Sequence, residues 1–172
     1  MALQSTNNIV GYWEPPNPGW LKLNTDGSSI TKMEKASYGG LIRNAHGGWI
    51  CGYAGKIRYD TSLASEIWGI FEGLELIRKM RLRNVVIETD SSEAFSLITV
   101  NGVDDSHPQS SLIRKCTKHL LELKCYMVHT RRNGNRCADV MAKLGGTQLE
   151  EFLVYKEPPP TLVWFLFDDV MA

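Results

Sequence analysis

The sequence has no excess of either charge. Lys plus Arg and Asp plus Glu each number 19 among 172 residues, so the formal net charge is zero. These totals do not indicate a strongly basic nucleic-acid binder, and any basic surface must come from local patches. With 43% hydrophobic and 22% charged residues, the composition is typical of a single globular domain and argues against global disorder.

The sequence also lacks closely spaced cysteines. It has four cysteines, and no two are separated by the two residues typical of zinc knuckles and redox motifs. We therefore expect reduced, structural thiols at Cys51, Cys116, Cys125 and Cys137.

Long apolar segments are missing as well. The longest apolar run lies near "LVWFLF", far short of the roughly 20 residues that span a bilayer. The start, "MALQSTNN", has neither the basic nor the apolar region of a signal peptide. We expect an intracellular monomer in the nucleus or cytoplasm, neither secreted nor bound to a membrane.

Alternation and helical periodicity divide the chain into nine expected elements. The expected strands are 20–27, 37–44, 48–57, 84–90 and 125–132, and the expected helices are 61–83, 91–100, 110–123 and 135–145. Three strands in a meander, followed by alternating strands and helices, predict an α/β fold. Its sheet would have five strands, three antiparallel and then parallel ones, with helices on both faces.

Composition changes near both ends of the chain. Residues 1–17 are polar and then rich in proline, which is typical of an irregular lead-in. Residues 18–146 contain all the expected elements and form the predicted domain. Residues 147–172 form a tail whose apolar part, with Trp164 and Phe165, is expected to pack on the domain because exposed apolar surface is unfavourable.

Four acids fall at comparable places in this pattern. Asp26 is on the first strand, Glu66 is in the first turn of the first long helix, Asp90 ends the strand 84–90, and Asp139 is in the first turns of the last helix. Massed carboxylates repel each other and need a cation to stay ionised. Mg²⁺ prefers such oxygen ligands, and two ions could hold a phosphodiester for hydrolysis. The alternative is that these acids are scattered, solvated or capping residues.

A family resemblance rests on five segments of the sequence: "KLNTDGS", "YGGLIRN", "LASEIWGIFEGL", "VVIETDS" and "NGNRCADVMAKLG". In this order, over about residues 18–146, the chain resembles ribonuclease H domains. It is most similar to the ribonuclease H-like domains of plant non-LTR retroelement reverse transcriptases and their domesticated relatives. The resemblance implies the ribonuclease H-like fold and an Asp-Glu-Asp-Asp set at Asp26, Glu66, Asp90 and Asp139.

The resemblance also implies an activity. Two Mg²⁺ ions, with Mn²⁺ as a substitute, would support hydrolysis of the RNA strand of an RNA–DNA hybrid, leaving a 3′-hydroxyl and a 5′-phosphate. Two alternatives stay open. One is a catalytically weak or silent nucleic-acid-binding or protein-interaction module with the same fold. The other is a different nuclease of the superfamily, acting on another nucleic acid.

Several further residues are candidates for contacts with substrate. Gly27 would leave room beside Asp26, and Asn24 and Ser28 could bind the sugar or backbone. Arg131 and Arg132 could meet phosphates, and Asn44 is a weaker candidate that turn chemistry also explains.

His129 is a possible auxiliary residue. It lies ten residues before Asp139, and catalytically assisting histidines in several ribonucleases H keep that spacing from their last Asp. Here "YMVHTRRN" is expected to continue as a strand through His129, so a histidine that only packs or bonds locally is the other interpretation.

Three differences from the family pattern stand out. The family usually has Ala where this chain has Ser65 and Gly69. The basic, Trp-bearing extra helix of bacterial ribonucleases H is missing, and "NGVDDSHPQ" takes its place. We therefore expect weaker binding of the hybrid.

Overall fold

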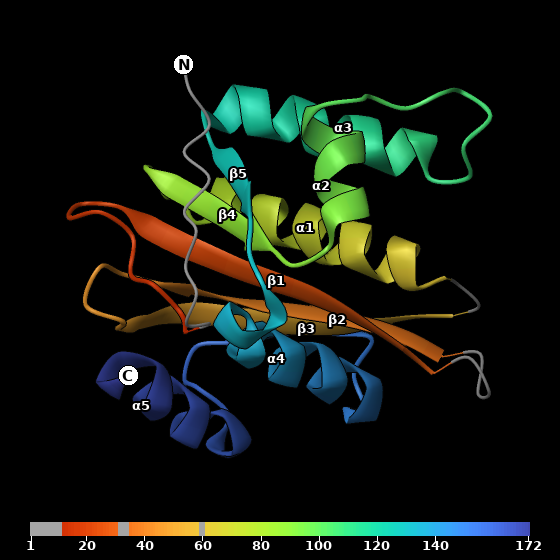
Figure 1. Cartoon of the computed structure of the whole chain (residues 1–172). Coiled ribbons are helices and arrows are strands. Elements are labelled where there is room, and N and C mark those ends of the chain that lie inside the picture. The colour runs from red at the N-terminus through yellow and green to blue at the C-terminus, as the bar shows by residue number, and fades with distance from the viewer. Residues whose placement is uncertain (1–11, 31–34, 59–60) are drawn as a thin grey trace.

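A mixed six-stranded β-sheet forms the centre of the molecule (Figure 1). The computed structural model describes residues 12–30, 35–58 and 61–172. Across the sheet the strands are β5 (Tyr126–His129), β4 (Val85–Thr89), β1 (Leu21–Ile30), β2 (Lys35–Arg43), β3 (Trp49–Arg58) and β6 (Phe152–Tyr155). Pairing is antiparallel from β1 through β2 and β3 to β6, and parallel from β1 through β4 to β5.

Helices cover both faces of this sheet. In Figure 1, α1 (Ser62–Lys79), α2 (Ser92–Thr99) and α3 (Ser110–Leu123) lie on one side, and α4 (Arg136–Thr147) and α5 (Val163–Met171) on the other. Single 3₁₀ turns at Arg132–Gly134 and Pro160–Leu162 precede α4 and α5. The predicted α/β class and mixed sheet are confirmed. The prediction of five strands was wrong by one, because β6 is too short to show a clear alternation.

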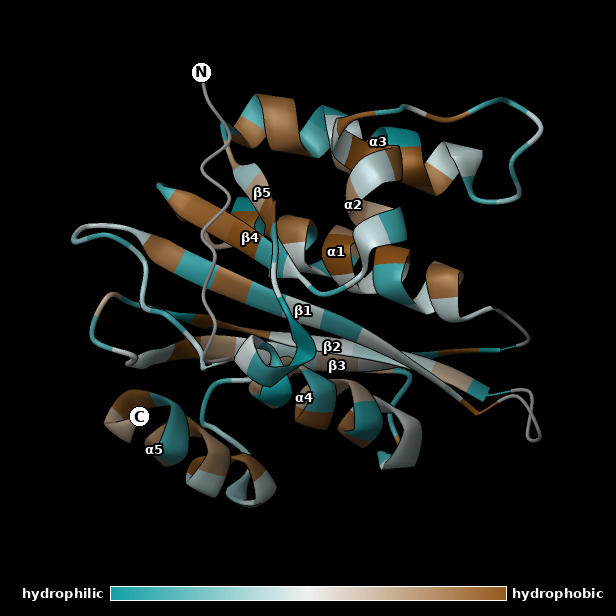
Figure 2. Cartoon of the chain, in the orientation of Figure 1, coloured by the Kyte–Doolittle hydropathy of each residue, from teal (hydrophilic) through white to brown (hydrophobic). Residues whose placement is uncertain are grey.

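Strand β4 is buried on both faces, as its run of β-branched residues predicts. All five of its residues are buried, and Figure 2 shows apolar residues along it. One apolar core fills the space between the sheet and the helices α1, α2 and α3 on one of its faces. A smaller core, around Leu41, Met141 and Leu162, joins the sheet to α4 and to the 3₁₀ turn before α5.

Several element boundaries differ from those expected by a few residues, and two of the differences have a clear physical reason. Strand β5 ends at His129 rather than continuing to residue 132, because the chain turns there into the 3₁₀ turn. Helix α4 continues through Gly145 to Thr147. A side chain at position 145 would meet the backbone of Gly55 in β3, so the glycine lets α4 lie close to the sheet rather than ending it.

The residues after α4 add to the same sheet. β6 pairs with β3, and Leu162 is fully buried. Phe165 is half-buried against the smaller core, as expected, but the prediction for Trp164 was wrong, because that residue is 66% exposed. In the lead-in, residues 1–11 lie outside the described part of the chain, and Trp13 is buried.

None of the helices formed by the described residues is long and apolar enough to cross a membrane.

Candidate active site

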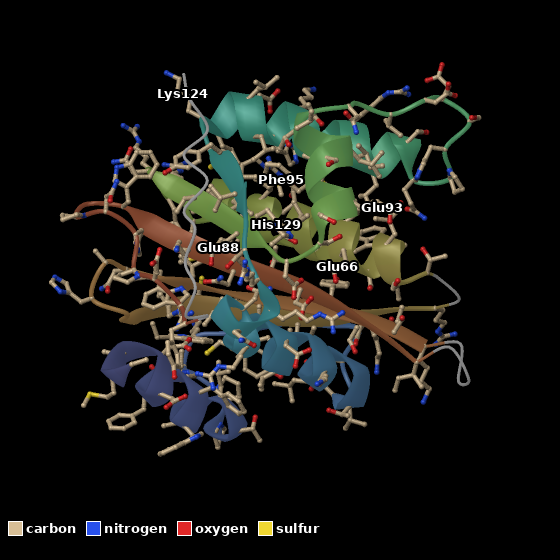
Figure 3. All side chains as sticks on the ribbon, in the orientation of Figure 1. Glu66, Glu88, Glu93, Phe95, Lys124 and His129 are labelled. Carbon is tan, nitrogen blue, oxygen red and sulfur yellow. The ribbon has the colours of Figure 1, made fainter. Side chains whose placement is uncertain are left out.

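Three of the four predicted acids converge. Asp26 is on β1 and Asp90 directly follows β4; these strands are parallel neighbours with Thr25 opposite Thr89, so the two acids are adjacent. Glu66 comes from α1, in its second turn rather than the predicted first, and Figure 3 shows it near β1. One carboxylate oxygen from each of Asp26, Glu66 and Asp90 lies within 4.8 Å of the other two.

Close packing of α1 on β1 brings Glu66 to this cluster. A Cβ atom at Gly27 would lie only 2.5 Å from the backbone nitrogen of Glu66, and it would also collide with Ser65. Gly27 therefore permits close contact between strand and helix. It also lines the cavity around the acids, so its expected contact with substrate stays a prediction. Thr61 caps this end of α1 by accepting a hydrogen bond from the backbone nitrogen of Ala64 at 3.1 Å.

The cluster is electrostatically unfavourable without a cation. Burial, followed by the charges of Glu66 and Asp90, raises the pKa of Asp26 to about 10. Burial likewise raises the pKa of Glu66 to about 7 and shifts that of Asp90 upward. The Glu66 Oε2 atom is buried and has no hydrogen-bond partner among the described residues. Hard divalent cations bind such oxygens, so the donor set fits Mg²⁺ or Mn²⁺.

The cluster lies in a polar cavity of about 780 Å³. All four acids line this cavity, together with Gly27, Ser28, Ser29, Ser62, Leu63, Ser91, Ser92, Glu93, Arg132, Asn133, Arg136 and Lys143. Asp139 is on the wall but outside the three-acid cluster, and its carboxylate accepts a hydrogen bond from Lys143 Nζ at 2.9 Å. Lys143 is one helical turn further along α4, so this is a local ion pair.

The predicted substrate contacts divide into two groups. Ser28 and Arg132 line the cavity, whereas Arg131 is exposed outside its wall. Asn44 is far from the acids. The preceding residue, Arg43, pairs with Lys22 near the start of β1, whereas Asp26 is further along β1 and pairs with Gly39. The Asn44 side-chain oxygen accepts hydrogen bonds from the backbone nitrogens of His46 and Gly48, which corrects its assignment from substrate contact to turn stabilisation.

Asn24 does not face the cavity either. Its side chain is fully buried, donates hydrogen bonds to Glu88 and Asn135, and accepts one from Trp13. With these partners it cannot reach a substrate, and the expected sugar or backbone contact was wrong. The physical reason is that α4 and the lead-in cover this face of β1.

His129 lies beside the cluster without lining the cavity. Its Nε2 atom is 3.2 Å from the backbone oxygen of Asp90, and the side chain is exposed at the end of β5 (Figure 3). A local hydrogen bond of this kind agrees with the interpretation of a histidine that bonds its neighbours.

Residues 24–145 match the family model described as "Reverse transcriptase-like". The chain belongs to this reverse transcriptase-like, ribonuclease H-like family. The match includes Asp26, Glu66, Asp90 and Asp139, so the whole candidate site lies inside the shared region.

A curated relative from Arabidopsis thaliana, named "Putative ribonuclease H protein", is 35% identical over 161 residues. The alignment covers 93% of this chain but only 26% of that protein, so the chain spans about a quarter of the relative's length.

Solved structures with the family fold are more distant in sequence. RNase H1 of Halobacterium salinarum has a TM-score of 0.66 at 18% identity, covering 74% of this chain and 97% of that one. The N-terminal RNase H domain of a Mycobacterium tuberculosis protein has a TM-score of 0.67 at 19% identity, covering 74% and 93%. LC11-RNase H1, solved in complex with an RNA/DNA hybrid, has a TM-score of 0.66 at 18% identity, covering 74% and 96%.

The two departures from the family's usual alanines are explained by packing. A Cβ atom at Gly69 would lie 2.6 Å from Thr25 Oγ1 and 3.0 Å from the backbone oxygen of Asp26. Glycine therefore lets this turn of α1 lie close to β1. Ser65 is buried and donates a hydrogen bond to the Ser62 backbone oxygen at 2.7 Å.

Sequence reasoning missed several cavity residues of this family member. Ser91 and Ser92 directly follow Asp90, and Lys143 is on α4 one turn after Asp139. Arg136, which the sequence groups with Arg131 and Arg132 in a basic patch, lines the cavity as well. Residues 101–109, where bacterial ribonucleases H have their extra basic helix, form turns and loop.

Proposed function

We propose that this chain is a divalent-metal-dependent endonuclease that hydrolyses the RNA strand of RNA–DNA hybrids. The observation that carries the proposal is the approach of Asp26, Glu66 and Asp90 to within 4.8 Å in a polar cavity. Membership of a family whose relatives are named ribonucleases H supports the reaction class. A similar fold solved with an RNA/DNA hybrid supports the substrate class.

Asp26, Glu66 and Asp90 would hold two Mg²⁺ ions, with Asp139 completing the set. When bound, such ions supply Lewis-acid stabilisation for the attacking water and for the leaving oxygen of a phosphodiester. The protein's own contribution is orientation. The three clustered acids come from β1, from α1 and from the residue after β4, so their carboxylates lie close together before any ligand arrives.

The rest of the cavity suits a sugar–phosphate backbone. Ser28, Ser62 and Ser92 offer hydroxyl groups along the wall, and such groups bind phosphate oxygens or a ribose 2′-hydroxyl. Arg132, which follows β5, forms no ion pair with any described residue and so offers a cation to a phosphate.

One contact favours the alternative of a catalytically silent module. Asp139 is paired with Lys143 and stands apart from the other three acids. If that pair persists in solution, the acid set is incomplete and the cavity could bind nucleic acid without cleaving it. Lys143→Ala distinguishes the two cases: release of Asp139 raises the turnover of an enzyme and leaves a silent module silent.

A cleavage assay with a panel of substrates tests the proposal. The purified chain is incubated with Mg²⁺ and a labelled RNA–DNA hybrid, double-stranded RNA or single-stranded DNA. We expect cleavage of the RNA strand of the hybrid, giving 3′-hydroxyl products. Cleavage of DNA in preference to the hybrid would identify another nuclease of the superfamily, and binding without cleavage would identify the silent module.

A further inference from the structure

A layer of polar side chains lies buried beside the acid cluster. Asn24 on β1 has no exposed surface, Asn135 directly before α4 is 2% exposed, and Glu88 on β4 is 7% exposed. We call these three residues the buried clasp. They come from the three elements that carry or precede Asp26, Asp90 and Asp139.

Hydrogen bonds join the clasp across these elements. Asn24 Nδ2 donates to Glu88 Oε1 at 3.1 Å and to Asn135 Oδ1 at 3.0 Å. Asn135 Nδ2 in turn donates to the backbone oxygen of Thr25 at 3.0 Å. Lys22 on β1 forms an ion pair with Glu88 at 2.9 Å, so the Glu88 carboxylate, which points toward β1, is also satisfied (Figure 3).

Each clasp residue has a fixed relation to one acid. Asn24 is two residues before Asp26, and Glu88 is two residues before Asp90, so each pair shares a face of the sheet. Asn135 is four residues before Asp139, and its backbone oxygen accepts the Asp139 backbone N–H at 3.1 Å. A shift of Asn135 would move the first turn of α4, and with it Asp139, relative to β1.

Helix capping does not explain Asn135. It occupies the residue before α4, where an asparagine normally accepts a hydrogen bond from the helix, yet its side chain makes no capping bond. Both side-chain polar atoms point to β1 instead.

Stability alone is also a weak explanation for the clasp. Buried polar groups must give up hydration, and well-packed apolar side chains of similar volume often give equal or greater stability. A hydrogen-bonded amide fixes the relative position of the two elements that it joins, because hydrogen bonds depend on direction. An apolar contact allows the same elements to slide past each other. The clasp lies where the three acid-bearing elements meet, so fixing their relative positions there also fixes the spacing of the acids.

We propose that the buried clasp is a positioning device that sets the spacing of the metal-binding acids. Asn135 is its central residue, because it links β1 and α4 directly and β4 through Asn24. This inference rests on the proposed function, since it concerns the same site. It assigns a role to residues that touch neither the cavity nor a bound ion.

Asn135→Ala is the test, because it removes both clasp bonds of Asn135 without removing a helix cap. Mg²⁺ is titrated calorimetrically into the metal-free chain and into the variant. We expect the variant to bind Mg²⁺ about tenfold more weakly, at the lower end of the range for a lost direct partner of a metal ligand, because Asn135 acts through the backbone beside Asp26. In hybrid cleavage, kcat should fall with little change in KM, because Asn135 does not line the cavity.

The control is a variant of equal stability loss that lies away from the acids. Ile113 on α3 is 1% exposed in the larger core, and Ile113→Val destabilises the fold without touching the clasp; Leu120→Ala, on the same helix, serves if a larger loss must be matched. The control should keep Mg²⁺ affinity within twofold of wild type.

Equal Mg²⁺ affinity and kcat in wild type and Asn135→Ala would overturn the clasp while leaving the proposed function in place. A loss of affinity equal to that of the stability-matched control would also overturn it. Absence of any Mg²⁺ binding by the wild-type chain would instead overturn the proposed function on which the clasp rests.

Discussion

Arg43 on β2 and Asp169 on α5 form an ion pair of 2.9 Å in which each side chain is only 1% exposed. The Arg43 guanidinium also stacks on Trp13, with its central carbon 3.8 Å from the ring centroid. This pair ties the C-terminal helix and the lead-in to the sheet from the side of α4.

Removal of one partner leaves a buried charge unpaired. We expect Asp169→Ala to lower the free energy of unfolding by about 3–5 kcal/mol. The neighbouring Asp168 is half-exposed, so Asp168→Ala should cost less than about 1 kcal/mol. Urea unfolding of both variants measures the difference, and equal losses would show that the Arg43–Asp169 pair is not buried in solution.

Asp26→Asn should stabilise the metal-free chain at pH 8. The pKa of Asp26 is raised from 3.8 to about 10, so the folded state holds the proton more tightly than the unfolded state. Wild-type stability is therefore lost as the pH rises from about 4 toward 10, whereas asparagine stays neutral. We expect a gain of at least about 1.4 kcal/mol at pH 8, equivalent to one pKa unit.

Unfolding in EDTA at two pH values measures this effect. The difference between Asp26→Asn and wild type should be present at pH 8 and vanish below about pH 4, where both side chains are neutral. A wild type that is more stable than the variant at pH 8 without metal would contradict the repulsive cluster.

Affinity for the hybrid should be modest and sensitive to salt. Arg136 is held by Asp168 and Asp169, and Lys143 by Asp139, which leaves Arg132 as the unpaired cation of the cavity wall. Arg132→Gln should reduce the slope of log affinity against log salt by about one.

The adjacent Arg131 provides a matched control, because it has the same charge and lies outside the cavity wall. Binding is titrated at two salt concentrations for both variants. An equal change in slope for Arg131→Gln would mean that the two arginines contribute only to the general field of the protein.

His129→Ala should lower turnover tenfold or less. The side chain bonds the Asp90 backbone and lies outside the cavity wall, whereas a positioned general acid–base typically contributes roughly 10²–10⁴-fold. Single-turnover cleavage measures the effect. A hundredfold loss at unchanged stability would assign His129 a direct part in the reaction.

Periodicity was enough to place the strands and the helix that carry the acids, but not to select the acids themselves. The sequence predicts β1, β4 and α1, and parallel pairing of the two strands brings Asp26, within β1, next to Asp90, directly after β4. The ribonuclease H resemblance, rather than spacing, selected the four positions from 19 acidic residues.

The clasp and the role of Asn24 could not be predicted in this way. Alternation along β1 shows which residues share a face, but whether that face meets solvent depends on Asn135, 111 residues away. Gly27 posed the same problem, since its packing against Glu66 depends on how closely α1 approaches. Trp164 was misplaced because an apolar pattern does not tell which side of a helix faces the domain.

Location of bound metal tests the account most directly. Crystals of the chain soaked in Mn²⁺ would reveal the ions by anomalous scattering. We predict anomalous density for Mn²⁺ between the carboxylates of Asp26, Glu66 and Asp90, in a preparation that cleaves the hybrid. The same density should be absent from crystals of Asp26→Asn. Crystals of an active preparation with Mn²⁺ bound elsewhere, or with none at these three acids, would contradict the account.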